Sequence, residues 1–191
     1  SESAAALMYP GRSVRRRAEY RRIAAFYDTG WSLSEQWLAQ AGFRAIAVDL
    51  PGYSPTLKGN QRQIFRLAQA IKDASRPLIM AGGGVITSGA SAELLALMEK
   101  TNIPAVAPLM GLGGIPSDHP LFLGMPGMHG TAAANLALSE CDLIVGIGTR
   151  FDDRVTSHKE SFGAHATIAH IDIDPSEIGK NVRADIPVVG D

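Results

Sequence analysis

The chain has 191 residues, of which 46% are hydrophobic, and its formal net charge at pH 7 is −1. This length favours one domain with a sizeable core, and the charge gives no sign of nucleic-acid binding or of attraction to an acidic membrane. Its one cysteine, Cys141, cannot form an internal disulfide, which is typical of a reducing compartment such as the cytoplasm. No apolar run reaches the roughly 18 residues of a membrane span.

The first 45 residues are the least informative part of the chain. Six arginines between positions 12 and 22 make this segment basic, and Ile23, Phe26 and Tyr27 follow at helical spacing. It can be a solvated helix, vector-derived sequence or a targeting segment, and we favour the first two. We therefore expect residues 1–45 to be a segment of unclear origin and residues 46–191 to be one domain.

Residues 45–50, AIAVDL, predict a short apolar strand, and residues 53–59 predict an extended linker. The string GFRAIAVDLPGYS is also similar to the second strand of α/β-hydrolases. No Gly-x-Ser-x-Gly nucleophile elbow follows it, so we discount that interpretation.

From Asn60 onward, helical and strand patterns alternate regularly. Helices are predicted over residues 61–75, 88–100 and 131–139, strands over 77–81, 103–108, 142–148, 167–173 and 186–189, and a short helix or turn over 175–179. Strands that alternate with helices form parallel sheets through right-handed crossovers. The pattern predicts an α/β three-layer sandwich with a parallel, Rossmann-like sheet of about six strands.

Two glycine-rich turns lie between these elements. Gly82-Gly83-Gly84 follows a strand but lacks the last glycine of the dinucleotide fingerprint, because Thr87 stands there; a tight structural turn and a turn beside a phosphate remain equally open. The second turn, Gly124 to Gly130, contains His129 and precedes a helix that Thr131 can cap. The amide groups and positive dipole end of such a helix suit a phosphate.

Charged residues follow two of the buried strands. Arg150, Asp152, Asp153 and Arg154 predict either a surface salt-bridge loop or a planar arginine fork that can hold a diphosphate or a flavin carbonyl. Asp172 and Asp174 end another strand, where carboxylates can bind a metal or a ribose hydroxyl. No third metal ligand is visible, so we favour the ribose.

Five motifs in this order resemble the central domain of the FAD-dependent acetolactate synthases, which are thiamine-diphosphate enzymes. They are Tyr53-Ser-Pro-Thr-Leu-Lys-Gly, Ala81-Gly-Gly-Gly-Val, Gly124-Met-Pro-Gly-Met-His-Gly, Gly148-Thr-Arg-Phe-Asp-Asp-Arg-Val and His170-Ile-Asp-Ile-Asp-Pro. The resemblance covers about residues 53–191, and it raises the binding interpretation of the Gly82 turn above the purely structural one. Thr149 departs from the alanine that is commoner in the family, and Pro108 from its usual threonine.

The resemblance implies that this domain binds FAD and that FAD has no net redox role. The implied contacts are Gly82, Gly83, Gly84, Leu109, Met110, Gly127, Met128, His129, Gly130, Gly148, Thr149, Arg150, Asp152, Arg154, Val155, Asp172, Ile173, Gly190 and Asp191. Within this set, Leu109, Met110 and His129 are expected at the flavin, and Asp172 and Ile173 at the adenosine. No catalytic residue and no metal ligand is expected in this chain.

The resemblance also implies a parent reaction that joins two 2-oxo acids such as pyruvate with loss of CO₂, in branched-chain amino-acid synthesis. Thiamine diphosphate and Mg²⁺ would bind to flanking domains, because this sequence contains no Gly-Asp-Gly…Asn pattern of the right length. A cytoplasmic homo-oligomer with a regulatory subunit is expected, and the isolated chain is expected to be inactive. The alternatives are a stand-alone adenine-dinucleotide-binding or interaction module, and the central domain of another carboligase such as glyoxylate carboligase.

Overall fold

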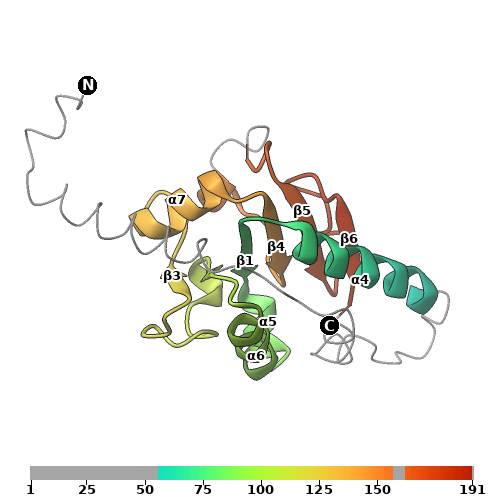
Figure 1. The fold of residues 1–191 in the computed structure, drawn as a ribbon, viewed down its shortest axis with the longest axis horizontal. Coiled ribbons are helices and arrows are strands. Elements are labelled where there is room, and N and C mark those ends of the chain that lie inside the picture. The colour runs from blue at the N-terminus through green and yellow to red at the C-terminus, as the bar shows by residue number, and fades with distance from the viewer. Residues whose placement is uncertain (1–55, 157–161, 191) are drawn as a thin grey trace, which may run out of the picture.

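The computed structural model describes residues 56–156 and 162–190, which form one parallel β-sheet between two helical layers (Figure 1). The sheet has six strands in the order β3-β2-β1-β4-β5-β6, and each neighbouring pair is parallel. The strands are β1 (Pro77–Ala81), β2 (Ala105–Val106), β3 (Phe122–Gly124), β4 (Leu143–Ile147), β5 (Thr167–Asp172) and β6 (Ile186–Val189). The predicted α/β fold with a parallel sheet is therefore confirmed.

Helical segments connect the strands. They are α4 (Thr56–Asp73), α5 (Gly83–Thr87), α6 (Ser91–Thr101), the 3₁₀ turn η1 (Leu109–Gly111), α7 (Ala132–Glu140) and α8 (Asp153–Thr156). Within the described ranges, no helix combines the length and the apolar character that a membrane crossing requires.

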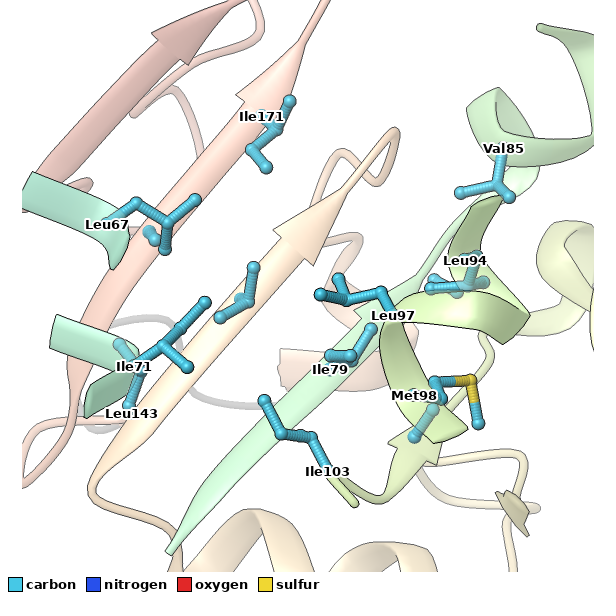
Figure 2. Close-up of a cluster of buried hydrophobic side chains, with 14 of the residues drawn as sticks. Leu67, Ile71, Ile79, Val85, Leu94, Leu97, Met98, Ile103, Leu143 and Ile171 are labelled. Atoms are coloured by element: carbon cyan, nitrogen blue, oxygen red, sulfur yellow. The ribbon is translucent and has the colours of Figure 1, made fainter. Parts of the chain in front are cut away.

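One face of the sheet is covered by α4 and α6. Leu67 and Ile71 of α4 are fully buried because they lie one helical turn apart on the same face. Figure 2 shows them over β4 and β5, while Leu94, Leu97 and Met98 of α6 cover β1. The strands between are apolar along their whole length, as expected of a parallel sheet that is buried on both faces.

The opposite face is covered by α7 and by the chain that follows β4. Ala134 and Ala137 are fully buried, so their small side chains let α7 approach the sheet closely. Phe151, from the loop after β4, fills the rest of this layer together with Ile168 and Val182. The two separate apolar clusters confirm the predicted three-layer arrangement.

The strand order reverses direction between β1 and β4. The chain runs outward from β1 to β2 and β3, returns through α7 to β4 beside β1, and then runs outward the other way to β5 and β6. In open α/β sheets, ligands bind at the carboxyl ends of the strands where this reversal occurs. The carboxyl ends of β1 and β4 are therefore the place to look for a site.

At the opposite edge of the sheet, Asp142 connects the amino ends of the strands through hydrogen bonds. The carboxylate of Asp142 accepts hydrogen bonds from the backbone N–H groups of Ser75 and Arg76, at 2.7 and 2.8 Å. The backbone of Asp142 also bonds to Arg76 and to Thr167. This one residue ties the entries of β1, β4 and β5 together.

Several element boundaries differ from the prediction. Residues 56–59 belong to α4 rather than to an extended linker; Gly59 costs about 1 kcal/mol of helix propensity, which the buried face of α4 offsets. Strand β3 was not predicted, because three residues that end in glycine show no alternation of apolar and polar positions. The strand predicted over residues 103–108 is shorter in the structure, where β2 has only two residues. The predicted helix over 88–100 begins at Ser91, and α5 precedes it.

The predicted strand over residues 45–50, the first part of the predicted linker and the arginine-rich segment lie outside the described residues. The expected count of about six strands is met because β3 supplies the sixth strand of the described sheet.

Candidate functional site

The turns that follow β1 and β4 are packed directly against each other. The backbone N–H of Gly82 donates to the carbonyl oxygen of Ile147 at 2.9 Å, and that of Gly84 donates to Gly148 at 3.0 Å. A Cβ atom on Gly82 would lie only 2.1 Å from the carbonyl oxygen of Gly148. Glycine is thus required here by the contact between the two turns, and these two amides are not available to a phosphate.

The 3₁₀ turn η1 lies against the same place. A Cβ atom on Gly83 would be 3.1 Å from the carbonyl oxygen of Met110, and one on Gly111 would be 2.1 Å from that of Ala81. The ends of β1, β2 and β4 are therefore held together by backbone contacts.

The loop from Gly148 to Val155 points its charged and apolar side chains in opposite directions. Phe151 is 1% exposed and packs into the core, whereas Arg150 and Arg154 are on the surface. The carbonyl oxygen of Arg150 accepts a hydrogen bond of 2.9 Å from the side chain of Asn181. The loop thus presents two guanidinium groups at the carboxyl end of β4, next to the β1 turn.

Asp152 lies between these two arginines and is bonded to both. Its carboxylate accepts from Arg150 Nη2 at 3.1 Å and from the backbone N–H of Arg154 at 3.0 Å. A hydrogen bond with the side chain of Asp153, the backbone bond from Arg154 and the Arg150 guanidinium together lower the pKa of Asp152 to about 2. Asp152 is therefore ionised at neutral pH, and its ion pair with Arg150 orients the guanidinium group.

The glycine-rich turn before α7 reaches the same loop. Gly127 has φ +100°, and a Cβ atom there would lie 2.4 Å from the carbonyl oxygen of Arg154. The side chain of Asn135 closes the turn, because it accepts from the N–H of Gly127 at 2.8 Å and donates to its carbonyl oxygen at 2.9 Å. Thr131 caps α7 by accepting from the N–H of Ala134 at 3.1 Å, as predicted.

Several amides of this turn are already bonded within the protein. The N–H of Gly127 donates to the side chain of Asn135, and those of Gly130 and Thr131 donate to the carbonyl oxygens of Gly127 and Met125. His129, whose side chain is exposed, has no hydrogen bond or ion pair within the described ranges.

Four apolar residues of the predicted site are on the surface. Leu109 is 64% exposed, Met110 77%, Met128 82% and Ile173 57%. They are four of the seven large hydrophobic side chains that are exposed in the described part of the chain. Isolated exposed apolar residues need no explanation, but a set of them around one sheet edge is typical of a binding surface.

The carboxyl end of β5 carries Asp172 and Ile173. One oxygen of Asp172 accepts from the N–H of Asp174 at 2.9 Å, and the N–H of Gly190 donates to its carbonyl oxygen at 3.0 Å. Asp174 instead accepts from the N–H of Ser176 at 2.8 Å. The described residues contain no cluster of three or more His, Cys, Asp or Glu side chains suited to a metal ion.

The structure thus brings the predicted residues to one edge of the sheet. Their loops follow β2, β1, β4, β5 and β6, which are consecutive neighbours, and the Gly127 turn contacts the loop after β4. The ends of β2 and β5 are three strand spacings apart, about 14 Å. A ligand that contacts both ends must be extended. Asp191 lies outside the described residues.

Four supporting residues were not identified from the sequence. Asn135 and Asn181 contact the site through bonds between distant positions, for which the sequence holds no signal. Gly146 and His170 lie inside strands. His170 stands between the apolar residues Ala169 and Ile171 in its strand, and this is a visible signal, because a buried imidazole needs partners.

Comparison with known proteins gives a consistent result. Residues 64–191 match the family model described as "Thiamine pyrophosphate enzyme, central domain". Over 144 residues, 75% of this chain, it is 60% identical to the probable acetolactate synthase large subunit of Methanocaldococcus jannaschii. Over the same share it is 53% identical to the acetolactate synthase of Mycobacterium leprae and 49% identical to the large subunit from Corynebacterium glutamicum. The matches cover 24%, 23% and 23% of these relatives, so the chain spans about a quarter of their length.

Proposed function

Because the chain belongs to the family of thiamine pyrophosphate enzyme central domains, we propose that it is the central, FAD-binding domain of an acetolactate synthase large subunit. The single observation that carries FAD binding is the order of side chains along the carboxyl edge of the sheet. Exposed apolar residues follow β2, two arginines follow β4, and a carboxylate ends β5. The same order of groups occurs along FAD: a flat aromatic flavin, a diphosphate, and a ribose joined to adenine.

Each end of the edge suits one end of this ligand. Leu109, Met110 and Met128 supply apolar surface for the isoalloxazine ring, beside His129. At the other end, the oxygen of Asp172 that does not bond to Asp174 can accept from a ribose hydroxyl, and Ile173 can pack on the adenine. A ligand with two aromatic ends and a length above about 14 Å fits this separation, and a mononucleotide does not reach both.

The middle of the edge suits a diphosphate. Arg150 and Arg154 can neutralise its charge and bind its oxygens through their guanidinium groups. The glycine turns at Gly82–Gly84 and Gly127–Gly130 act mainly by close backbone approach, because several of their amides are already used. Gly148, Thr149, Val155, Gly190 and Asp191 complete the proposed contact set.

The parent enzyme's chemistry would take place on other domains. Thiamine diphosphate and Mg²⁺ would be bound by flanking domains, where two 2-oxo acids such as pyruvate are joined with loss of CO₂. We propose that this parent is a cytoplasmic homo-oligomer that also binds a regulatory subunit, and that residues 46–191 form the central domain. The role of the present chain is to bind and orient FAD.

The experiment is a titration of the full 191-residue chain, with flavin fluorescence for FAD and riboflavin and calorimetry for ADP. We expect FAD to bind more tightly than ADP, and both more tightly than riboflavin, because the diphosphate contacts the arginines. Equal affinity for riboflavin and FAD would place the diphosphate elsewhere, and no binding of FAD or ADP at millimolar concentration would overturn the proposal. An acetolactate assay with pyruvate, thiamine diphosphate and Mg²⁺ is expected to remain at background.

A further inference from the structure

Phe151 has a backbone conformation that is unfavourable for an aromatic residue. Its φ is +50°, and among the described non-glycine residues only Asn102 shares a positive φ. Asn102 stands at the C-terminal cap of α6, where a left-handed residue is common. A bulky side chain in this region is a genuine outlier, and such outliers persist where the surroundings force them.

The side chain of Phe151 is held by contacts on three sides. A Cβ atom on Gly146 would lie 2.4 Å from Cζ of the ring, so only glycine at this position of β4 leaves space for it. The ring packs edge-to-face on His170, with centroids 4.9 Å apart at 90°, and against Phe162 at 5.9 Å. Gly146 and His170 are register partners in β4 and β5, so the ring lies over both strands beside the carboxyl edge.

The residues on either side of Phe151, Arg150 and Asp152, form an ion pair at the protein surface, with Nη2 and Oδ2 3.1 Å apart. The ring of Phe151 between them points in the opposite direction, into the core. The left-handed backbone at Phe151 makes this reversal of the chain possible.

We propose that Phe151 is a positioning residue: its ring, seated on Gly146 and His170, fixes the loop so that the Arg150 guanidinium faces the diphosphate of the bound nucleotide. This inference rests on the proposed function, since it assigns Arg150 to the diphosphate. Phe151 itself contacts no ligand, because it is buried in the core. Its effect on binding is transmitted through Arg150.

The test compares ADP with adenosine as ligands of the full chain, measured by calorimetry. Phe151→Leu keeps an apolar side chain but leaves the space over Gly146 partly empty. We expect it to weaken ADP binding about tenfold and to leave adenosine binding nearly unchanged, because only ADP carries the groups that Arg150 binds. Leu138→Ala is the matched control: it removes apolar volume from the same core cluster without removing a ring that packs on Phe151, so it is expected to lower the unfolding temperature but to keep the ADP-to-adenosine ratio.

A double-mutant cycle separates positioning from general loosening. In an Arg150→Ala background, Phe151→Leu is expected to change ADP affinity by less than about twofold, because the group it positions is gone. Equal losses in both backgrounds, or an unchanged ratio of ADP to adenosine affinity, would overturn the inference while the proposed function stands. Should the leucine variant not fold, Phe151→Met, whose longer and more flexible side chain can extend over Gly146, is measured in its place. Failure of the wild-type chain to bind ADP or FAD would overturn the proposed function together with this inference.

Discussion

Gly84 and Gly148 are joined by a hydrogen bond of 3.0 Å, and a Cβ atom on Gly84 would lie 2.7 Å from the Cα of Gly148. They belong to the turns after β1 and β4, the two strands between which the sheet reverses its order. The crevice expected at this reversal is therefore closed at its floor by glycine backbones. What faces outward is the set of loops that follow β2, β4 and β5.

This contact predicts unequal effects of alanine at neighbouring glycines. In Gly82→Ala the new methyl group meets the backbone oxygen of Gly148, which cannot move without shifting β4, so we expect a loss of about 2–3 kcal/mol in unfolding free energy. In Gly83→Ala the nearest atoms, from Met110, are 3.1 and 3.2 Å away, and we expect a smaller loss. Urea unfolding of both variants checks this, and the reverse order would contradict the proposed packing.

We expect the stability of the fold to depend on pH through His170. This residue is 1% exposed, and its Nε2 atom has no hydrogen-bond partner in the described structure. Burial lowers the pKa of the imidazole, and this outweighs the opposing influences of the Thr149 backbone, Asp172 and Glu177. A histidine has a pKa of about 6.5 in the unfolded chain.

The direction of this pH dependence follows from the lower pKa of His170 in the folded chain. The unfolded chain binds the proton more readily, so the stabilisation from neutral His170 is complete above about pH 6.5 and is lost as the pH falls through the folded-state pKa. Urea unfolding at pH 7.5 and pH 5 measures it. His170→Asn is expected to reduce the difference between the two pH values, whereas the same change at the exposed His165 is expected to preserve it. An equal difference in wild type and His170→Asn would contradict the assignment.

Cys141 is expected to be unreactive in the folded chain. It is fully buried at the end of α7, and burial, together with the nearby charge of Asp142, raises the pKa of its thiol to about 12. Only the thiolate reacts with reagents such as Ellman's reagent. Because the chain has one cysteine, labelling is expected to be negligible in buffer and to reach one equivalent in denaturant. Rapid stoichiometric labelling in buffer would show that this part of the core opens.

The sequence predicted the elements whose patterns are long and apolar. Strands β1, β4, β5 and β6 appear within a residue or so of their expected bounds, because parallel strands buried on both faces are continuous apolar runs. It did not predict β3 or α5, since neither is long enough to show a period. Their positions depend on tertiary contacts, such as the hydrogen bond from Ala105 to Leu121 beside β3.

The position of the candidate site was predictable from the sequence, but the residues that support it were not. The charges at Arg150 and Asp172 follow apolar strands, so the sequence could place them at one edge of a parallel sheet. The ring of Phe151 points inward and packs over Gly146 because the backbone of Phe151 is left-handed, and no local sequence pattern predicts that conformation. The amides of the glycine turns also bond within the protein more than a sequence motif suggests.

Arg150 and Arg183 provide the most direct test of the central claim, that the carboxyl edge of the sheet binds the diphosphate of FAD. Both side chains are 70% exposed, and each forms an ion pair with an aspartate two residues later. Arg150 follows β4 at the carboxyl edge, whereas Arg183 precedes β6, at the amino edge. The two residues differ mainly in which edge they occupy.

The measurement is a titration of Arg150→Ala, Arg183→Ala and the unmodified chain with FAD. Removal of Arg150 is expected to cost about 1.5–3 kcal/mol, the range for hydrogen bonds to charged groups, which is a loss of roughly ten- to hundredfold in affinity. Removal of Arg183 is expected to change the affinity by less than about twofold. Equal affinity of the Arg150→Ala variant and the unmodified chain, or an equal loss in both variants, would contradict the account.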